Sequence, residues 1–116
     1  MESSATDDDL AIHIRLRRDR NLFLVAVDGS QIVGTLIAGW DGWRGSMARL
    51  AVHPSYRRRG IAQRLLDVAE ARLRKLGVKR IGALVRAGNK PAEQFWRTAG
   101  YVPEPKIRRF VKNVRK

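Results

Sequence analysis

The segment from residue 50 to residue 66 limits the possible folds more than any other part of the sequence. It reads Leu50-Ala-Val-His-Pro-Ser-Tyr-Arg-Arg-Arg-Gly-Ile-Ala-Gln-Arg-Leu-Leu66. This is the end of an apolar strand, a basic turn, and then apolar residues at helical spacing. The first amides of a helix have no partner within the helix, and the helix dipole adds partial positive charge there. Because Gly60 and Ala62 are small, the segment predicts an anion site at a helix N-terminus.

The rest of the sequence predicts one α/β domain over residues 1–116, with residues 1–6 flexible. Two β-rich runs flank Asp28-Gly29-Ser30, which is a hairpin signal. The expected elements are, in order, an amphipathic helix over 7–18, strands at 22–27, 31–38 and 46–53, a helix over 60–76, a strand at 80–85, a helix over 89–99, and a final strand pair at 101–102 and 107–114.

The charge balance is strongly basic, with 24 Lys and Arg residues against 11 Asp and Glu, a net charge of +13. Four of the acids fall in the first nine residues, which leaves seven acids against all 24 bases, or +17, in residues 10–116. This excess predicts affinity for anions such as nucleic acid, an acidic membrane face or phosphorylated small molecules.

Composition also excludes several classes of protein. The absence of Cys excludes a disulfide framework, a thiol nucleophile and a Cys-based metal site. The longest apolar runs, 22–27 and 32–40, fall well short of the roughly 18 residues of a membrane span, and no secretory signal is visible. His13 and His53 have no patterned carboxylates that would suggest a metal pair. We therefore expect a cytoplasmic protein with no metal and no membrane partner.

Two motifs, in order and at fixed spacing, point to one family. The first is Arg57-x-x-Gly60-x-Ala62, with Val52-x-Pro54 before it and Leu65-Leu66 after it. The second is Asn89-x-x-Ala92-x-x-Phe95-Trp96-x-x-x-Gly100-Tyr101. Together they resemble the acyl-CoA signature of the GNAT superfamily of N-acyltransferases and the motif that follows it, and the resemblance covers roughly residues 7–114.

The resemblance implies a GNAT-like fold, which is a mixed, mostly antiparallel central sheet with a splayed strand pair and flanking helices. It implies transfer of an acetyl group from acetyl-CoA, as co-substrate, to a primary amine of a small molecule or peptide by direct aminolysis of the thioester. The splayed strand would hold the pantetheine arm, and the helix N-terminus would cradle the pyrophosphate. The residues implied in CoA binding are Leu50, Ala51, Val52, Arg57, Arg58, Arg59, Gly60, Ile61, Ala62, Gln63, Asn89 and Trp96.

The chain departs from the family at Trp96, where many relatives carry a Tyr that can protonate the leaving thiolate. An indole N–H is no practical acid, so no catalytic residue is assigned and Trp96 is interpreted as a core or arm-packing aromatic. A backbone N–H near Val52 is a candidate oxyanion donor. Asp41, Glu93 and Glu104 are possible bases that we interpret as surface acids.

A second departure concerns the elements that help wall the acceptor site in relatives. The resemblance implies a short member that lacks the usual first strand and helix. The acceptor site is then open, or another subunit covers it, or the chain is a truncated paralogue. Our hypothesis is a homodimer. Trp40 and Asp41 begin a Gly-rich loop and are predicted to contact the substrate, although this loop is equally compatible with a hydrophobic plug.

Two other functions stay open. One is a catalytically weak CoA-binding module on the same fold, which Trp96 and the missing elements favour. The other is a basic nucleic-acid-binding domain, because residues 106–116 hold six bases and no acid. Such charge is also typical of a solvent-facing edge strand, and the sequence shows no paired-helix recognition motif.

Overall fold

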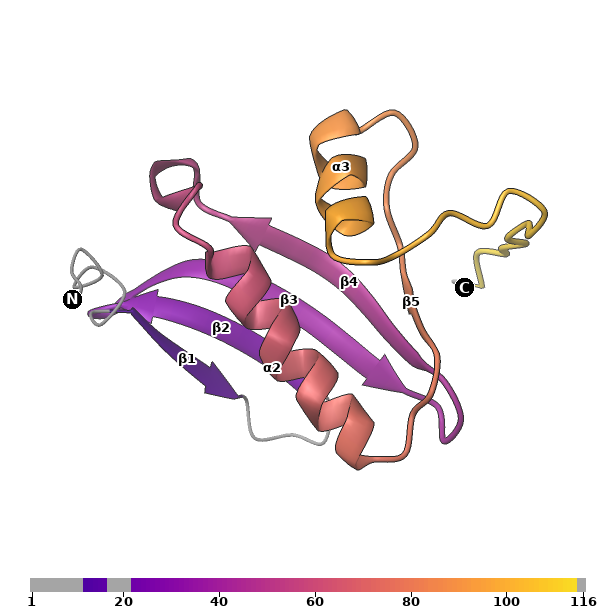
Figure 1. Cartoon of the computed structure of the whole chain (residues 1–116), viewed down its shortest axis with the longest axis horizontal. Helices are drawn as coiled ribbons and strands as arrows, with labels where there is room; N and C mark the ends of the chain where they lie inside the picture. The colour runs from indigo at the N-terminus through magenta and orange to yellow at the C-terminus, as the bar shows by residue number, and fades with distance from the viewer. Residues whose placement is uncertain (1–11, 17–21, 115–116) are drawn as a thin grey trace.

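A β-hairpin forms the centre of the sheet. The structure, a computed structural model, describes residues 12–16 and 22–114. Strands β2 (Leu22–Asp28) and β3 (Gln31–Trp40) are antiparallel and are joined by a tight turn, as predicted. Strand β4 (Gly45–Val52) pairs antiparallel with β3, and the short β5 (Ile81–Ala83) pairs parallel with β4. The sheet order is β1-β2-β3-β4-β5 (Figure 1).

Helix α2 (Ile61–Lys75) lies across one face of this sheet (Figure 1). Its apolar stripe meets the inward side chains of β2, β3 and β4, and this contact is the hydrophobic core. Gly34 on β3 allows the close approach, since a Cβ there would lie 3.1 Å from Cγ2 of Ile61 and 3.3 Å from Cδ1 of Leu65. The largest fully buried side chains are Leu24, Leu36, Met47, Leu65, Leu66, Leu73 and Val33.

Strands β4 and β5 separate soon after they pair. The parallel pairing joins Gly45–Met47 to Ile81–Ala83, and the N–H of Leu84 donates to the carbonyl of Met47 at 3.1 Å. Beyond that point β4 continues to Val52 without β5, and helix α3 (Lys90–Thr98) lies beside the diverging strands (Figure 1). The mixed, mostly antiparallel sheet with a splayed strand pair is therefore confirmed.

The helix predicted over 7–18 is wrong where the structure describes it. Residues 12–16 form strand β1 (Ile12–Leu16), antiparallel to β2. Their sequence alternates apolar and polar residues, which is the period of a strand, and pairing along β2 satisfies their backbone groups. Residues 7–11 and 17–18 lie outside the described residues, as does the segment 1–6 for which flexibility was expected. Within the described part of the chain, no helix precedes β2.

The final strand pair predicted at 101–102 and 107–114 is also wrong, because the structure has no strand there. Pro103 and Pro105 have no backbone N–H to donate to a neighbouring strand, so they interrupt strand pairing at this point. From residue 102 to residue 114 the large apolar side chains are exposed to solvent, and Phe110 is 91% exposed. Strand β5 is consequently an edge of the sheet as described.

Candidate functional site

The N-terminus of α2 is open and uncapped. After β4, the chain makes a short 3-10 turn, η1 (Pro54–Tyr56), and enters α2 through Gly60, whose φ of +79° is in the left-handed region. Gly60 has no side chain to cap the helix, and the backbone N–H groups of 61–63 meet no acceptor among the described residues. A Cβ on Gly60 would meet no atom within 4 Å, so the space before these amides is free. This arrangement fits an anionic group.

The three arginines before the helix have different surroundings. Arg57 donates from Nε to the carbonyl of Val52 at 3.2 Å, which ties the turn back to the end of β4. Arg58 is exposed and has a φ of +65°, so it makes the sharp bend of the turn. Arg59 is exposed, with its guanidinium 4.9 Å from the centre of the Tyr56 ring. Arg58 and Arg59 therefore present their charge beside the open helix end.

The Tyr56 ring under Arg59 is held to the sheet. Its hydroxyl donates to Oδ2 of Asp28, at the end of β2, over 2.6 Å. This hydrogen bond, followed by burial, raises the pKa of Tyr56 above its ordinary value. Neither residue was predicted to belong to the site. The only sequence signal was an aromatic residue directly before the arginine run, because Asp28 lies 28 positions away.

The predicted strand residues Leu50, Ala51 and Val52 lie where β4 has left β5. A β-bulge interrupts the β3–β4 pairing here, and Arg49 within it has a φ of +57°. Leu50 and Val52 are half-buried against the core, and Ala51 is exposed. Among the residues that the structure describes, no strand pairs with this part of β4 on its β5 side, so backbone groups there can bind an extended ligand.

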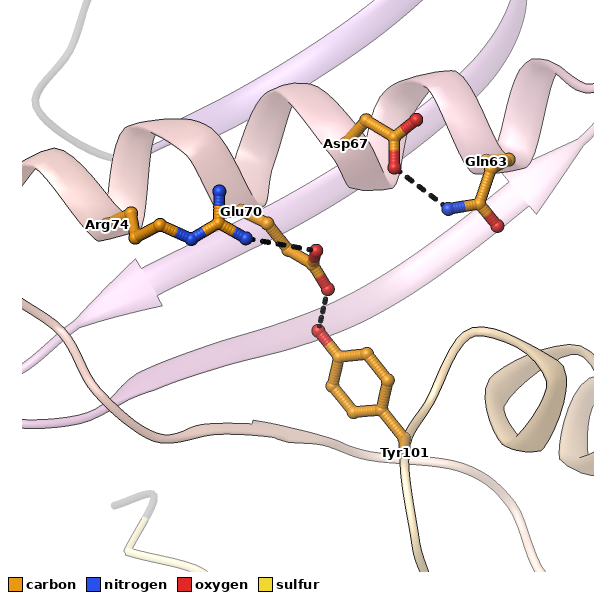
Figure 2. Close-up of polar contacts among 5 residues, drawn as sticks. All are labelled: Gln63, Asp67, Glu70, Arg74 and Tyr101. Carbon is orange, nitrogen blue, oxygen red and sulfur yellow. Dashed lines mark hydrogen bonds and ion pairs between the residues drawn. The ribbon is translucent and has the colours of Figure 1, made fainter.

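The three predicted residues at the start of α2 differ in what they can offer to a ligand. The Ile61 side chain is 2% exposed and belongs to the core, so only its backbone can contact a ligand. Gln63 is exposed, and its side chain donates to Asp67 on the next turn at 2.8 Å (Figure 2). Ala62 is half-buried and small, which keeps the helix end accessible.

Helix α3 carries the other two predicted residues. Asn89 is its N-cap, and its side-chain oxygen accepts from the N–H of Ala92 at 3.2 Å. The cap leaves the NH₂ of Asn89 as the group that a ligand would meet. Trp96 is 7% exposed and packs edge-to-face against Phe95 and Tyr101. Trp96 is therefore a core residue, which was one of the two interpretations, a core aromatic or an aromatic that packs on the pantetheine arm.

The structure does not bring Trp40 and Asp41 to the open end of α2. They lie at the opposite end of β4, whose length is about 23 Å at 3.3 Å per residue. Asp41 accepts from the N–H groups of Arg44 and Trp43, both at 2.8 Å, and these bonds lower its pKa. A pocket of about 390 Å³ is lined there by Trp40, Asp41, Arg44, Gly45, Ser46, Arg80, Gly82 and Glu104.

The other candidate bases are engaged in structural contacts. Glu93 accepts from the N–H of Gly88 at the start of α3, and Glu104 is ion-paired with Arg80. His53, which directly follows β4, is engaged as well, because its Nδ1 atom accepts from the N–H of Ser55 at 3.0 Å. Within residues 12–16 and 22–114 no three His, Asp or Glu side chains group as metal ligands, and no helix is long and apolar enough to cross a membrane.

Comparison with known proteins agrees with this geometry. The sequence model of the Acetyltransferase (GNAT) family matches residues 2–101. An acetyltransferase of Sodalis glossinidius is 41% identical over 83 residues, which are 72% of this chain but only 58% of the relative. The PaiA N-acetyltransferase of Thermoplasma acidophilum, crystallised with coenzyme A, is 25% identical with a TM-score of 0.68, covering 75% of this chain and 55% of that one.

An aminoglycoside acetyltransferase from an uncultured soil metagenomic sample, in complex with sisomicin, shares the fold. It is 19% identical, with a TM-score of 0.72, and the match covers 86% of this chain and 70% of that one. The family match spans most of the sequence and the fold agrees with it. The chain therefore belongs to the GNAT acetyltransferase family.

Proposed function

We propose that this protein is an N-acetyltransferase that transfers the acetyl group of acetyl-CoA to a primary amine. The observation that carries the proposal is the open, uncapped N-terminus of α2 beside the unpaired end of β4. The names of the relatives and the coenzyme A complex of the Thermoplasma acidophilum protein support it. The matched part is only 58% of the Sodalis glossinidius relative, so the proposed activity rests on the site described above and not on the relative's name alone.

In this proposal the backbone amides of about 58–63 hold the pyrophosphate. Arg58 and Arg59 supply exposed charge, while Arg57 mainly holds the turn against Val52. The free edge of β4 at 50–52 hydrogen-bonds to the pantetheine arm as a missing strand would. Asn89 offers its NH₂ to the same arm from α3, and Trp96 supports α3 from the core.

The reaction is attack of a neutral amine on the thioester carbonyl carbon, in which a C–N bond forms and the C–S bond breaks. An ammonium group with a pKa of about 10.4 must first lose its proton, and the departing thiolate must gain one. No side chain is assigned to either transfer, so water carries both protons in this scheme. The protein contributes by aligning the reactants and by donating a backbone N–H near Val52 to the developing oxyanion.

The acceptor class is an amine on a small molecule or a peptide. The relative that was crystallised with sisomicin supports a small-molecule amine. Trp40 and Asp41 lie one strand length from the phosphate end, so we assign them to the remote part of the acceptor. The pKa of Asp41 is lowered, so its carboxylate stays charged and can pair with a second cationic group.

The decisive experiment is release of free thiol from acetyl-CoA with a panel of peptide N-termini, lysine, polyamines, aminoglycosides and small metabolic amines. Turnover with one class supports the proposal and names the acceptor. Thermal stabilisation by CoA without thiol release with any amine would favour the weak CoA-binding module. Duplex binding that is salt-sensitive and survives saturating CoA would favour the nucleic-acid-binding domain.

A homodimer remains part of the proposal, and so does a cytoplasmic location. Four large apolar side chains of the C-terminal segment are at least 68% exposed, which is the kind of surface that association buries. They are Ile107, Phe110, Val111 and Val114. A monomeric mass in light scattering at high protein concentration would remove the dimer from the proposal.

A further inference from the structure

Helix α3 is held to the rest of the domain by few groups. Of its nine residues, only Trp96 is buried. The helix nevertheless lies beside the diverging strands β4 and β5 (Figure 1). Asn89 forms its N-cap. In the proposed function α2 binds the phosphates and α3 flanks the pantetheine arm. The relative placement of the two helices therefore decides whether both halves of the site fit one CoA molecule.

The end of α3 is rigidly joined to Tyr101. Gly100 has a φ of +100°, and its N–H donates to the carbonyl of Arg97 at 3.0 Å. The N–H of Tyr101 donates to the carbonyl of Trp96 at 2.9 Å, and this pair of bonds is the Schellman motif. The rings of Tyr101 and Trp96 also pack edge-to-face, with centroids 4.9 Å apart. Tyr101 consequently moves with α3.

The hydroxyl of Tyr101 reaches across to α2. It donates to Oε2 of Glu70 at 2.5 Å, while Oε1 of Glu70 lies 3.8 Å from Arg74 (Figure 2). The Glu70 side chain is only 21% exposed, so the bond is shielded from water. Burial, then the bond to Glu70, raises the pKa of Tyr101, and the hydroxyl keeps its proton at neutral pH. The contact joins two elements 31 residues apart in the sequence.

We propose that Tyr101 is a positioning residue for acyl-CoA, which acts through Glu70 by latching the pantetheine-flanking helix α3 to the phosphate-binding helix α2. The inference rests on the proposed function. Without the latch, α3 keeps the packing of Phe95 and Trp96 on the core but can shift about that contact, so binding of CoA must then order it at a cost in affinity. A ligand that occupies only the phosphate end gains nothing from the latch.

Tyr101→Phe tests this, because it removes the hydroxyl and keeps the ring that packs on Trp96. We expect the Kd for CoA and the KM for acetyl-CoA to rise about 3- to 10-fold, the range for loss of one hydrogen bond. kcat should change less than about two-fold. The Kd for 3′,5′-ADP, which lacks the pantetheine arm, should stay at the wild-type value. Glu70→Gln keeps an acceptor and should bind CoA nearly as wild type does.

Two further variants keep the test clear. Glu70→Ala removes the acceptor without touching the aromatic cluster, and should match Tyr101→Phe. Thr98→Ala removes an exposed hydrogen bond to Gln94 within α3 and should leave both affinities unchanged. Binding is measured well below the Tm of each variant. If Tyr101→Phe binds CoA like the wild type, or if its Kd values for CoA and for 3′,5′-ADP rise equally, the proposed role of Tyr101 is overturned while the proposed function stands. A wild-type protein that does not bind CoA overturns both.

Discussion

The guanidinium of Arg59 lies over the ring of Tyr56 at 4.9 Å, and the hydroxyl of Tyr56 donates to Asp28 at 2.6 Å. This chain of contacts connects the start of α2 to the end of β2, two elements of the fold that are far apart in sequence. It holds an exposed cation in one position beside the uncapped helix amides. Such pre-organisation reduces the entropy lost when a phosphate binds.

Arg59→Ala should therefore weaken CoA binding by about 10-fold, since an exposed, charge-assisted contact is lost. Isothermal titration with CoA at a fixed salt concentration measures the effect. Arg72→Ala is the matched control, because it removes the same charge near the other end of α2. Equal losses in both variants would mean that net charge, and not this position, attracts the cofactor.

Gly60→Glu should abolish CoA binding. A side chain would enter the free space before the helix amides, and its carboxylate would repel the phosphates. Gly77→Glu is the control, because Gly77 has a φ of +90° and open space for a side chain, but follows the C-terminus of α2. Both variants lose roughly 1 kcal/mol of stability from the left-handed backbone. Unchanged CoA affinity in Gly60→Glu would show that the phosphates bind elsewhere.

Trp96→Tyr should give equal or higher turnover, because a Tyr hydroxyl can protonate the leaving thiolate and an indole N–H cannot. The same change removes volume from a buried position and should lower the free energy of unfolding by about 1–3 kcal/mol. Urea unfolding and kcat at saturating substrate measure the two effects separately. Trp43→Tyr, at a side chain that is 78% exposed, should leave stability unchanged. A marked loss of kcat in Trp96→Tyr would mean that the indole itself takes part.

The raised pKa of Tyr101 predicts a specific response to alkaline pH. The unfolded-state pKa of Tyr is about 10, so the stabilisation from protonated Tyr101 is complete below that pH and is lost as pH rises above it. The difference in Tm between wild type and Tyr101→Phe should be constant up to about pH 9 and should shrink above pH 10. Titration of Tyr56, which is present in both proteins, affects them equally and cancels. A difference that stays constant to pH 11 would contradict the prediction.

The features that the sequence predicted correctly are local ones. Helix α2 was expected over 60–76 from the helical spacing of apolar residues, and it lies at Ile61–Lys75. The hairpin followed from the turn residues between two β-rich runs, and the open helix end followed from a basic turn before small residues. Each depends on contacts within a few residues, where backbone preference and side-chain periodicity act directly.

The failures have an equally physical origin. The segment 12–16 satisfies both an apolar i, i+4 spacing with its neighbours and a strict alternation, and only the available edge of β2 selects the strand. Residues 101–102 and 107–114 were expected to pair as strands, but Pro103 and Pro105 lack the backbone N–H groups that strand pairing needs. Local pattern leaves such segments undecided, because strand formation requires a partner supplied by the rest of the fold.

The sequence by itself determined that the chain forms an α/β domain and that a helix begins after the basic turn, at the place where we propose the anion site, because motif residues at close spacing specify both. Only the tertiary structure decided that Arg57 bonds back to β4 while Arg58 and Arg59 stay available at the helix end, and that Trp40 and Asp41 lie at the far end of β4. It also decided that Tyr56 and Tyr101 anchor the two sides of the candidate site. Those assignments depend on the Asp28–Tyr56 and Glu70–Tyr101 contacts, which span 28 and 31 residues. The first contact joins the turn after β4 to the end of β2, and the second joins the segment after α3 to α2, so both arise only when these elements pack together and no local periodicity encodes them.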